Sequence, residues 1–361
     1  MNFKSPGFRS KLKKVLFLTA GWIVAAIYIV IIQYSQTGKK FLEKNFAEVI
    51  VLTILEVLIT GIILACFEVF YFTDRFKYRS FSSAVIIKSL FYTTVLISLV
   101  FIIAFIESII LRSYSSDFFN NILPSLLLLL FMWGPVFILS IFMLQVSDKF
   151  GQGVLLKFIQ GKYHSPKEEV RIFMFLDLKS STSIAEALGN VKYYELLNDF
   201  FYDVTDAIIE TKGEIYQYVG DEIIISWYLE NGIQDTNCLR CFYNIQNTVK
   251  NYSEKYESKY GLVPSFKAGI HYGQVTVGEI GVLKREIVFS GDVLNTTARI
   301  QELCNKYNEK LIISKDLLEK IQPGKKFMTK EIGQINLRGR AAAVILYGVK
   351  LNESLQNSYV N

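Results

Sequence analysis

Four long apolar stretches in the first 150 residues constrain most strongly what this chain of 361 residues can fold into. They cover residues 15–34, 46–72, 84–106 and 122–146. A helix that crosses a membrane needs about 20 mostly apolar residues to span about 30 Å of hydrocarbon, and each stretch reaches that length. The sequence therefore predicts an N-terminal four-helix transmembrane bundle over residues 1–146, with the lipid bilayer as its surroundings.

The charges divide the chain at the same place. There are 39 Lys and Arg against 33 Asp and Glu, a net charge of +6. Residues 1–150 hold 14 basic and 8 acidic side chains, so the whole excess lies in the apolar part and the remainder is neutral. Nucleic acid is therefore not an expected partner, because a soluble nucleic-acid binder gathers its basic residues on one surface. Four cysteines are also too few for a disulfide-stapled secreted domain.

Basic residues at the ends of the stretches predict their orientation. Five precede the first stretch and three lie between the second and third, whereas the two opposing connections carry three and one. Cytoplasmic connections carry the excess of Lys and Arg. We therefore expect a multi-pass protein of the inner (cytoplasmic) membrane, with the N-terminus and the following domain in the cytoplasm.

Several ionisable residues fall inside the apolar stretches, where each costs about 2.5–3.5 kcal/mol at a helix centre. One interpretation is a ligand or ion site within the bundle. The other, which we favour, is that Glu56 and Lys88 pair between helices while the rest reach out at the ends of the spans. The residues concerned are Glu48, Glu56, Glu68, Lys88 and Glu107.

Residues 147–169 form a connector of mixed charge that is too short for a domain. It is either an element that transmits changes between bundle and soluble domain or an inert tether, and the sequence leaves both open. The soluble domain is expected over residues 170–351, followed by a flexible tail over residues 352–361.

Hydrophobic periodicity in the soluble part alternates between the strand and helix repeats, which predicts an α+β domain. A continuous apolar run at residues 170–176 is typical of a buried central strand, and the first helix is expected to be capped by Ser or Thr. The expected strands are residues 170–176, 214–218, 222–227, 266–271, 274–278, 311–314 and 343–350, and the expected helices are residues 182–188, 191–211, 235–256 and 291–304.

Two aspartates stand out for their positions. Asp177 follows the apolar strand where a loop meets a helix, and Asp221 lies in a tight turn between two strands. Together they could share a divalent metal, because Mg²⁺ is bound by one or two carboxylates plus substrate phosphates. The segment 178–182 adds backbone N–H groups and a helix N-terminus, which suit a polyphosphate.

Three motifs in this order resemble the class III nucleotidyl cyclases: FLDLKSST at residues 175–182, YVGDE at 218–222 and SGDVLNTTARI at 290–300. GIHYG at 269–273 and LRGR at 337–340 support the likeness, which covers residues 171–350. The resemblance implies a ferredoxin-like (palm-type) α+β catalytic domain. It also implies an adenylate cyclase-type phosphorus–oxygen lyase that converts a nucleoside triphosphate to a 3′,5′-cyclic nucleotide and pyrophosphate.

The resemblance also implies roles for individual residues. Two Mg²⁺ (or Mn²⁺) ions would bind Asp177, Asp221 and the carbonyl of Leu178. Asn295 and Arg299 would orient the ribose and stabilise charge on the α-phosphate. The triphosphate would contact Arg338 and the loop residues Lys179, Ser180, Ser181 and Thr182.

In this family the metal carboxylates come from one subunit and the Asn/Arg pair from its partner. The resemblance therefore implies a head-to-tail homodimer with two composite sites. The ribose 3′-hydroxyl would attack the α-phosphorus, so positioning and electrostatics would supply most of the catalysis.

Base selection is the point at which this sequence departs from the family. Gln217 and Val288 occupy the positions at which adenylate cyclases usually carry Lys and Asp or Thr. Gln can donate to and accept from a base edge, whereas Val can only pack against it. We expect ATP as substrate, with GTP or a pyrimidine triphosphate as alternatives.

Two other functions compete with this one. A diguanylate cyclase shares a turn like that at residues 219–222, but the second Gly of its signature is missing and Asn295 and Arg299 are present. A catalytically silent membrane sensor would use the same dimer without chemistry. Retention of both aspartates argues against it, whereas Gln217 and Val288 keep it open.

Overall fold

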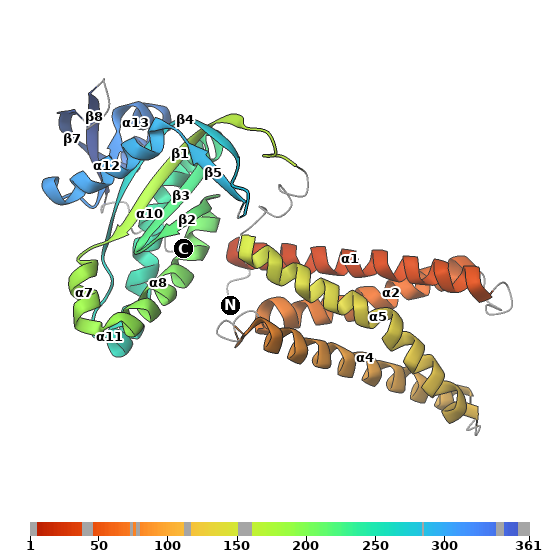
Figure 1. Cartoon of the computed structure of the whole chain (residues 1–361). Helices are drawn as coiled ribbons and strands as arrows, with labels where there is room; N and C mark the ends of the chain where they lie inside the picture. Colours follow the sequence, from red (N-terminus) through yellow and green to blue (C-terminus); the bar gives the residue numbers. More distant parts are fainter. Residues whose placement is uncertain are drawn as a thin grey trace. The chain divides into compact units, whose positions relative to one another are not determined.

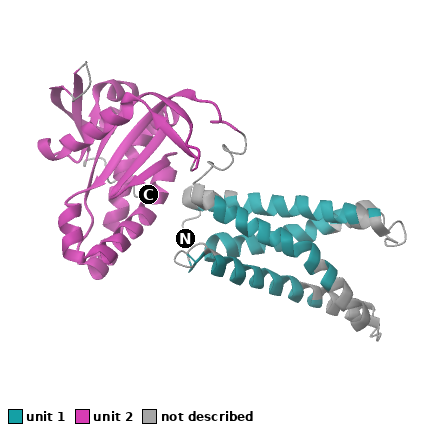
Figure 2. Cartoon of the chain, in the orientation of Figure 1, with its two compact units in different colours: residues 1–155 teal, residues 156–361 magenta. Residues whose placement is uncertain are grey.

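The computed structural model describes residues 6–37, 46–72, 75–76, 80–111, 117–150, 161–283, 285–336 and 343–352. The chain divides into two compact units, Met1–Leu155 and Leu156–Asn361 (Figure 2). Residues 151–160 of the expected connector and most of the expected tail lie outside the described residues.

Long helices make up the first unit (Figure 1). They are α1 (Pro6–Thr37), α2 (Phe46–Cys66) with its π-helical continuation η2 (Phe67–Phe72), α4 (Phe81–Leu111) and α5 (Asp117–Phe150). Their buried core joins residues of every helix, among them Trp22, Ala65, Tyr92 and Ile141. Many large apolar side chains instead point outward, such as Phe131, which is 79% exposed.

The four predicted helices are present, but four membrane spans are not confirmed. Among the described residues, two segments are long and apolar enough to cross a membrane, Lys14–Ile32 and Thr53–Phe72. Helices α4 and α5 contribute shorter apolar segments, Ser82–Ser98 and Leu130–Val146. Two apolar helices near the N-terminus therefore suggest membrane association.

The predicted pair between Glu56 and Lys88 is wrong. Lys88 forms its ion pair with Glu68, and the hydroxyl of Tyr92 donates to the same carboxylate. Glu68 is only 4% exposed, whereas Glu56 lies on the surface of the unit. The π-helical turn at Phe67–Phe72 changes the phase of the helix, and Glu68 within it faces the core.

The second unit is built on one sheet with helices packed against it (Figure 1). Its strand order is β2-β3-β1-β4-β6-β8-β7, and β5 pairs with β4 outside this path. The strands are β1 (Lys167–Leu178), β2 (Glu214–Val219), β3 (Glu222–Tyr228), β4 (Phe266–Ile280), β5 (Glu286–Ser290), β6 (Leu311–Ser314), β7 (Phe327–Ile335) and β8 (Val344–Leu351). The helices are α7 (Ser181–Leu188), α8 (Asn190–Glu210), α9 (Leu229–Ile233), α10 (Asn237–Asn251), α11 (Ser253–Tyr260), α12 (Asp292–Tyr307) and α13 (Lys315–Ile321), with short 3₁₀ turns η3 (Gln234–Thr236) and η4 (Gly324–Lys326).

The centre of the sheet confirms the predicted α+β class. Strand β1 pairs antiparallel with both β3 and β4, and β2 pairs antiparallel with β3. The resulting order β4-β1-β3-β2 is that of a ferredoxin-like split βαβ arrangement. Only β4 and β6 run parallel among the paired strands described.

The alternation of β1 decides which side chains reach the helices on each face. Ile172, Met174 and Leu176 are fully buried in the main core, together with residues of α8 and α10. Phe173 and Phe175 point the other way and pack with Val293 of α12. Because side chains alternate along a strand, Asp177 lies on the same face as these two phenylalanines.

Several expected elements differ from those observed. The helix expected at residues 235–256 is two helices, α10 and α11, which meet at Tyr252. The two strands expected at residues 266–271 and 274–278 are one strand, β4. It continues through Gly273, where an added Cβ would lie 3.2 Å from Val293, so the glycine serves close packing and not a turn. Strands β5 and β7 were not expected.

Candidate functional site

The register of the central strands gathers charged side chains in one row. Asp177 of β1 is the direct partner of Glu222 on β3 and of Lys267 on β4. Directly opposed residues of neighbouring strands point to the same face of a sheet. Asp221 immediately precedes Glu222 in the β2–β3 turn, and Gly220 supplies the left-handed backbone that the turn requires, with φ of 62°. The two predicted metal ligands are therefore neighbours.

Two residues that the sequence did not single out hold Asp177. Lys267 Nζ lies 3.3 Å from Asp177 Oδ2, and Gln301 Nε2 donates to the same oxygen at 2.9 Å. Both residues are buried, at 8% and 5% exposure. Lys267, the second residue of β4, carried no sequence signal for this contact, because the contact depends on the register of β4 with β1. Gln301 carried none, because its contact depends on how closely α12 packs on the sheet.

Burial and neighbouring charges raise the pKa of two carboxylates in this row. Burial raises the pKa of Asp177, and the charge of Asp221 raises it further. Burial raises the pKa of Glu222 to about 7, with Asp177 and Asp221 adding to the shift. The row therefore concentrates negative charge beyond what Lys267 neutralises.

One oxygen of this site has no hydrogen-bond partner in the part of the chain that the structure describes. Asp221 Oδ2 is buried and accepts no hydrogen bond. A buried acceptor of this kind is costly unless a cation or water satisfies it. Among the described residues no group of three His, Cys, Asp or Glu side chains is arranged to hold a metal by itself. Two carboxylates that leave room for other ligands instead fit Mg²⁺ or Mn²⁺ with substrate phosphates.

We expect the stability of the metal-free protein to fall as pH rises from about 4.5 to about 7, because Glu222 binds a proton more tightly in the folded state. The midpoint of thermal unfolding should drop by about 5 °C across this range. Mn²⁺ should restore it, more at pH 8 than at pH 5.5, because metal and protons compete for the carboxylates. Calorimetry with and without metal checks this. In Glu222→Gln most of the pH dependence should disappear, and an unchanged profile would contradict the assignment.

The loop after Asp177 offers fewer donors than expected. The backbone N–H of Lys179 is used by the carbonyl of Ser265, at 2.8 Å. Ser180 adopts a left-handed conformation with φ of 57° and makes no side-chain cap, so the expected Ser or Thr cap is wrong. Ser181 and Thr182 start α7, and their position next to Asp177 in the chain leaves the N-terminus of that helix near the carboxylates.

Helix α12 carries Asn295 and Arg299. Asn295 is exposed, and Arg299 is half-buried with Nη1 enclosed and without a hydrogen-bond partner. The helix approaches β4 closely at Gly269, where an added Cβ would lie 2.5 Å from the backbone nitrogen of Gln301. The Nη1 group of Arg299 is therefore a hydrogen-bond donor that no described residue of its own chain uses.

The two positions expected to contact the base lie on neighbouring segments. Gln217 is exposed on β2, and Val288 is half-buried on β5. The residues beside them touch: the N–H of Phe289 donates to the Tyr216 hydroxyl at 3.3 Å, and the two rings lie 4.8 Å apart. The remaining predicted residue, Arg338, lies outside the described residues.

Comparison with known proteins places this site in a family. Adenylate cyclase 2 of Rhizobium meliloti is 35% identical over 224 residues, which cover 61% of each chain. The adenylate cyclase of Anabaena cylindrica is 26% identical over 184 residues, 49% of this chain and 36% of the relative. This chain thus matches less than two thirds of the length of each of these two relatives.

A bacterial light-regulated adenylyl cyclase has the same fold, with a TM-score of 0.52 at 23% identity over 61% of this chain and 65% of that one. The family described as "Adenylate and Guanylate cyclase catalytic domain" matches residues 162–350. That segment contains the aspartate row, α7 and α12, and it spans more than half of the sequence. The chain therefore belongs to the adenylate and guanylate cyclase catalytic domain family.

Proposed function

We propose that this chain is a membrane-associated nucleotidyl cyclase that converts ATP to 3′,5′-cyclic AMP and pyrophosphate. The observation that carries the proposal is the proximity of Asp177, paired with Glu222, to Asp221 in the turn just before Glu222. One buried carboxylate oxygen of Asp221 has no partner among the described residues. ATP is the substrate we favour because the relatives in Rhizobium meliloti and Anabaena cylindrica are named adenylate cyclases.

The residues present suit this reaction. Asp177 and Asp221 would hold two Mg²⁺ or Mn²⁺ ions, which supply charge neutralisation at the phosphates and a lowered pKa for the attacking hydroxyl. Lys267 and Gln301 keep the Asp177 carboxylate in place through contacts to Oδ2. Positions 180–182 at the start of α7 lie where backbone donors can meet the phosphates.

The site of one chain is incomplete in this proposal. Asn295 is exposed and Arg299 Nη1 has no hydrogen-bond partner, which supports the use of both residues toward a substrate held by a second copy. A head-to-tail pair of chains would then form two composite sites, each with the metal carboxylates of one copy and the Asn295/Arg299 pair of the other.

The helical unit would serve as an anchor for this pair. Two of its segments are long and apolar enough to span a membrane. Chains held in one membrane meet at a high effective concentration, so that a weak contact between catalytic domains suffices for assembly. We place the catalytic domain in the cytoplasm, on the side indicated by the basic residues of the connections.

Incubation of the detergent-solubilised full chain with ATP, GTP, CTP and UTP in the presence of Mn²⁺ tests the proposal. Product masses should show cyclic AMP as the main product. Cyclic GMP or a cyclic pyrimidine nucleotide as main product would correct the substrate and retain the reaction. No cyclic nucleotide from any of the four, with the chain shown to be folded, would overturn the proposed activity and favour a silent sensor.

A further inference from the structure

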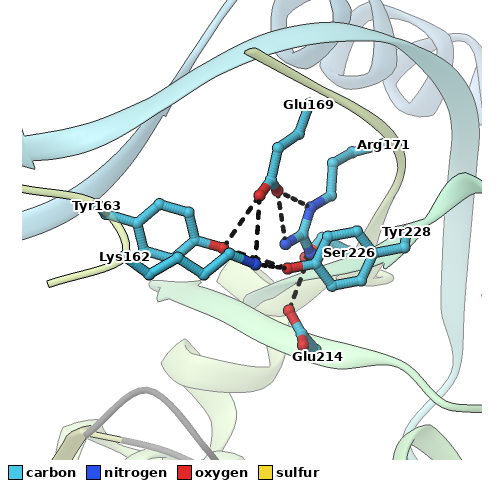
Figure 3. Close-up of polar contacts among 7 residues, drawn as sticks. All are labelled: Lys162, Tyr163, Glu169, Arg171, Glu214, Ser226 and Tyr228. Atoms are coloured by element: carbon cyan, nitrogen blue, oxygen red, sulfur yellow. Dashed lines mark hydrogen bonds and ion pairs between the residues drawn. The ribbon is translucent and has the colours of Figure 1, made fainter. Parts of the chain in front are cut away.

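A second polar cluster lies on the catalytic unit, around the N-terminal half of β1, whereas Asp177 lies near the C-terminal end of that strand. Figure 3 shows its side chains. Arg171 is its centre, and its guanidinium is fully buried. We call it the Arg171 cluster. Its members are Lys162, Tyr163, Glu169, Arg171, Glu214, Ser226 and Tyr228.

Hydrogen bonds and aromatic rings hold the guanidinium of Arg171 in one orientation. Its Nε donates to Glu169 Oε2 at 2.8 Å, and its Nη1 donates to Glu214 Oε2 at 2.9 Å. The guanidinium carbon lies 3.6 Å from the centre of the Tyr228 ring and 5.1 Å from that of Phe289. A planar guanidinium stacks on aromatic rings and donates hydrogen bonds in fixed directions, so it fixes the orientation of its neighbours. A lysine ammonium has no plane and does not impose this geometry.

The segment that enters the domain is tied to the same cluster. Lys162 Nζ donates to the Tyr228 hydroxyl at 2.9 Å and lies 3.6 Å from Glu169 Oε1. The Tyr163 hydroxyl donates to that Glu169 oxygen at 3.3 Å, while its carbonyl accepts from the Glu279 N–H of β4. The described residues in the second half of the connector are thus joined to β1, β3 and β4.

The contacts continue to the elements that would face the substrate. Phe289, next to Arg171, also packs on Phe173 and on Tyr216, with ring centres 5.4 and 4.8 Å apart. Phe289 directly follows Val288 on β5. Tyr163 is buried in one apolar cluster with Val293, two residues before Asn295 on α12.

A buried charge is not needed here for stability alone, since apolar residues of similar volume often stabilise a fold as well as a buried ion pair does. The ring contacts and directional hydrogen bonds of Arg171 instead restrict where β5 can lie relative to β1, β2 and β3. A small displacement of a substrate-contacting element is costly to binding and catalysis.

We propose that the Arg171 cluster is a positioning element that sets the placement of β5 and the start of α12, and thereby the affinity of the site for its nucleotide. The proposal rests on the proposed function for the identity of that nucleotide. Arg171 itself touches no substrate and acts through Phe289.

The test compares variants of the full chain in detergent. Arg171→Lys retains the charge and removes the plane, whereas Tyr163→Phe retains the buried ring and removes one hydroxyl. Tyr256→Phe is the matched control, because this buried tyrosine also donates to a carboxylate paired with a lysine, that of Asp203 with Lys255. Its contacts join α11 to α8 and not to β5.

Three quantities are measured for each variant: the KM and kcat for ATP, the dissociation constant of 3′-deoxy-ATP with Mn²⁺, and the midpoint of thermal unfolding. Arg171→Lys should raise KM and the dissociation constant together by about tenfold, with kcat changed less than about threefold. It should also alter the ratio of ATP to GTP use, because Val288 is next to Phe289. Tyr163→Phe should raise the same two constants by about threefold, and Tyr256→Phe should leave them unchanged.

The proposal is overturned if the folded Arg171→Lys and Tyr163→Phe variants keep the wild-type KM and dissociation constant and only unfold at a lower temperature. The cluster would then be a network that stabilises the fold. If Arg171→Lys does not fold, Tyr163→Phe alone decides by the same two constants. A wild-type chain that binds 3′-deoxy-ATP but forms no cyclic nucleotide would contradict the proposed function only, and the binding constants would still test the cluster.

Discussion

Replacing Asp221 by Asn is expected to lower kcat for cyclic nucleotide formation by about a thousandfold, because a neutral amide cannot hold the divalent ions that offset phosphate charge. Asp177→Asn should have an effect of the same size. The product is measured by mass over a range of Mn²⁺ concentrations, since weakened metal binding would be partly recovered at high metal.

Stability separates this effect from unfolding. The pKa of Asp177 is raised by burial and by the charge of Asp221, so its ionised form is disfavoured in the fold. Asp177→Asn should therefore unfold at the same temperature as the wild type or higher at pH 8. Asp316→Asn, an exposed acid at the start of α13, is the control and should keep full activity. Asn variants that retain wild-type kcat would refute the assignment of the metal ligands.

Co-expression of Asp177→Ala with Arg299→Ala should recover activity that neither variant has alone. In a two-fold symmetric dimer with composite sites, each mixed pair contains one site without a substitution. One of the two sites of a mixed dimer is intact, so we expect purified mixed dimers to show about half of the wild-type activity. The measurement uses two different affinity tags, with purification through both, so that only mixed dimers are assayed.

Recovery must depend on which residues are combined. Asp177→Ala with Asp221→Ala places both changes in the same half of the site, and this pair should recover nothing. If mixed dimers of Asp177→Ala and Arg299→Ala assemble, fold and remain inactive, the substrate site lies within one chain and the composite arrangement is wrong.

The parts of the site that the sequence predicted depend on local geometry. Asp177 marks the end of a strand and Asp221 marks a hairpin turn, which are both short local patterns, and the pairing of β1 with β3 brings the two residues together. Lys267 and Gln301 approach Asp177 from 90 and 124 residues away, as the distances in sequence show. Their contacts depend on the register of β1 with β4 and on the depth at which α12 packs, and no short pattern encodes either.

The errors in the helical unit have a similar cause. The pairing of Glu56 with Lys88 assumed that Glu68 reaches outward at the end of its span. Glu68 instead lies in a π-helical segment of six residues and faces the core, where it takes the place expected for Glu56. In the soluble part, two strands were expected on either side of residues 272 and 273, whereas one strand, β4, continues through Gly273.

The close approach at Gly269 gives α12 two duties. Gln301 of this helix steadies the Asp177 carboxylate of its own chain, and Arg299, two residues earlier, is proposed to serve the substrate of the other copy. The helix lies directly on the sheet, with no room for a Cβ at residue 269. In the proposed dimer, one helix would therefore contact the metal carboxylate of one site and the nucleotide of the other, so that binding at one site would alter the affinity of the other.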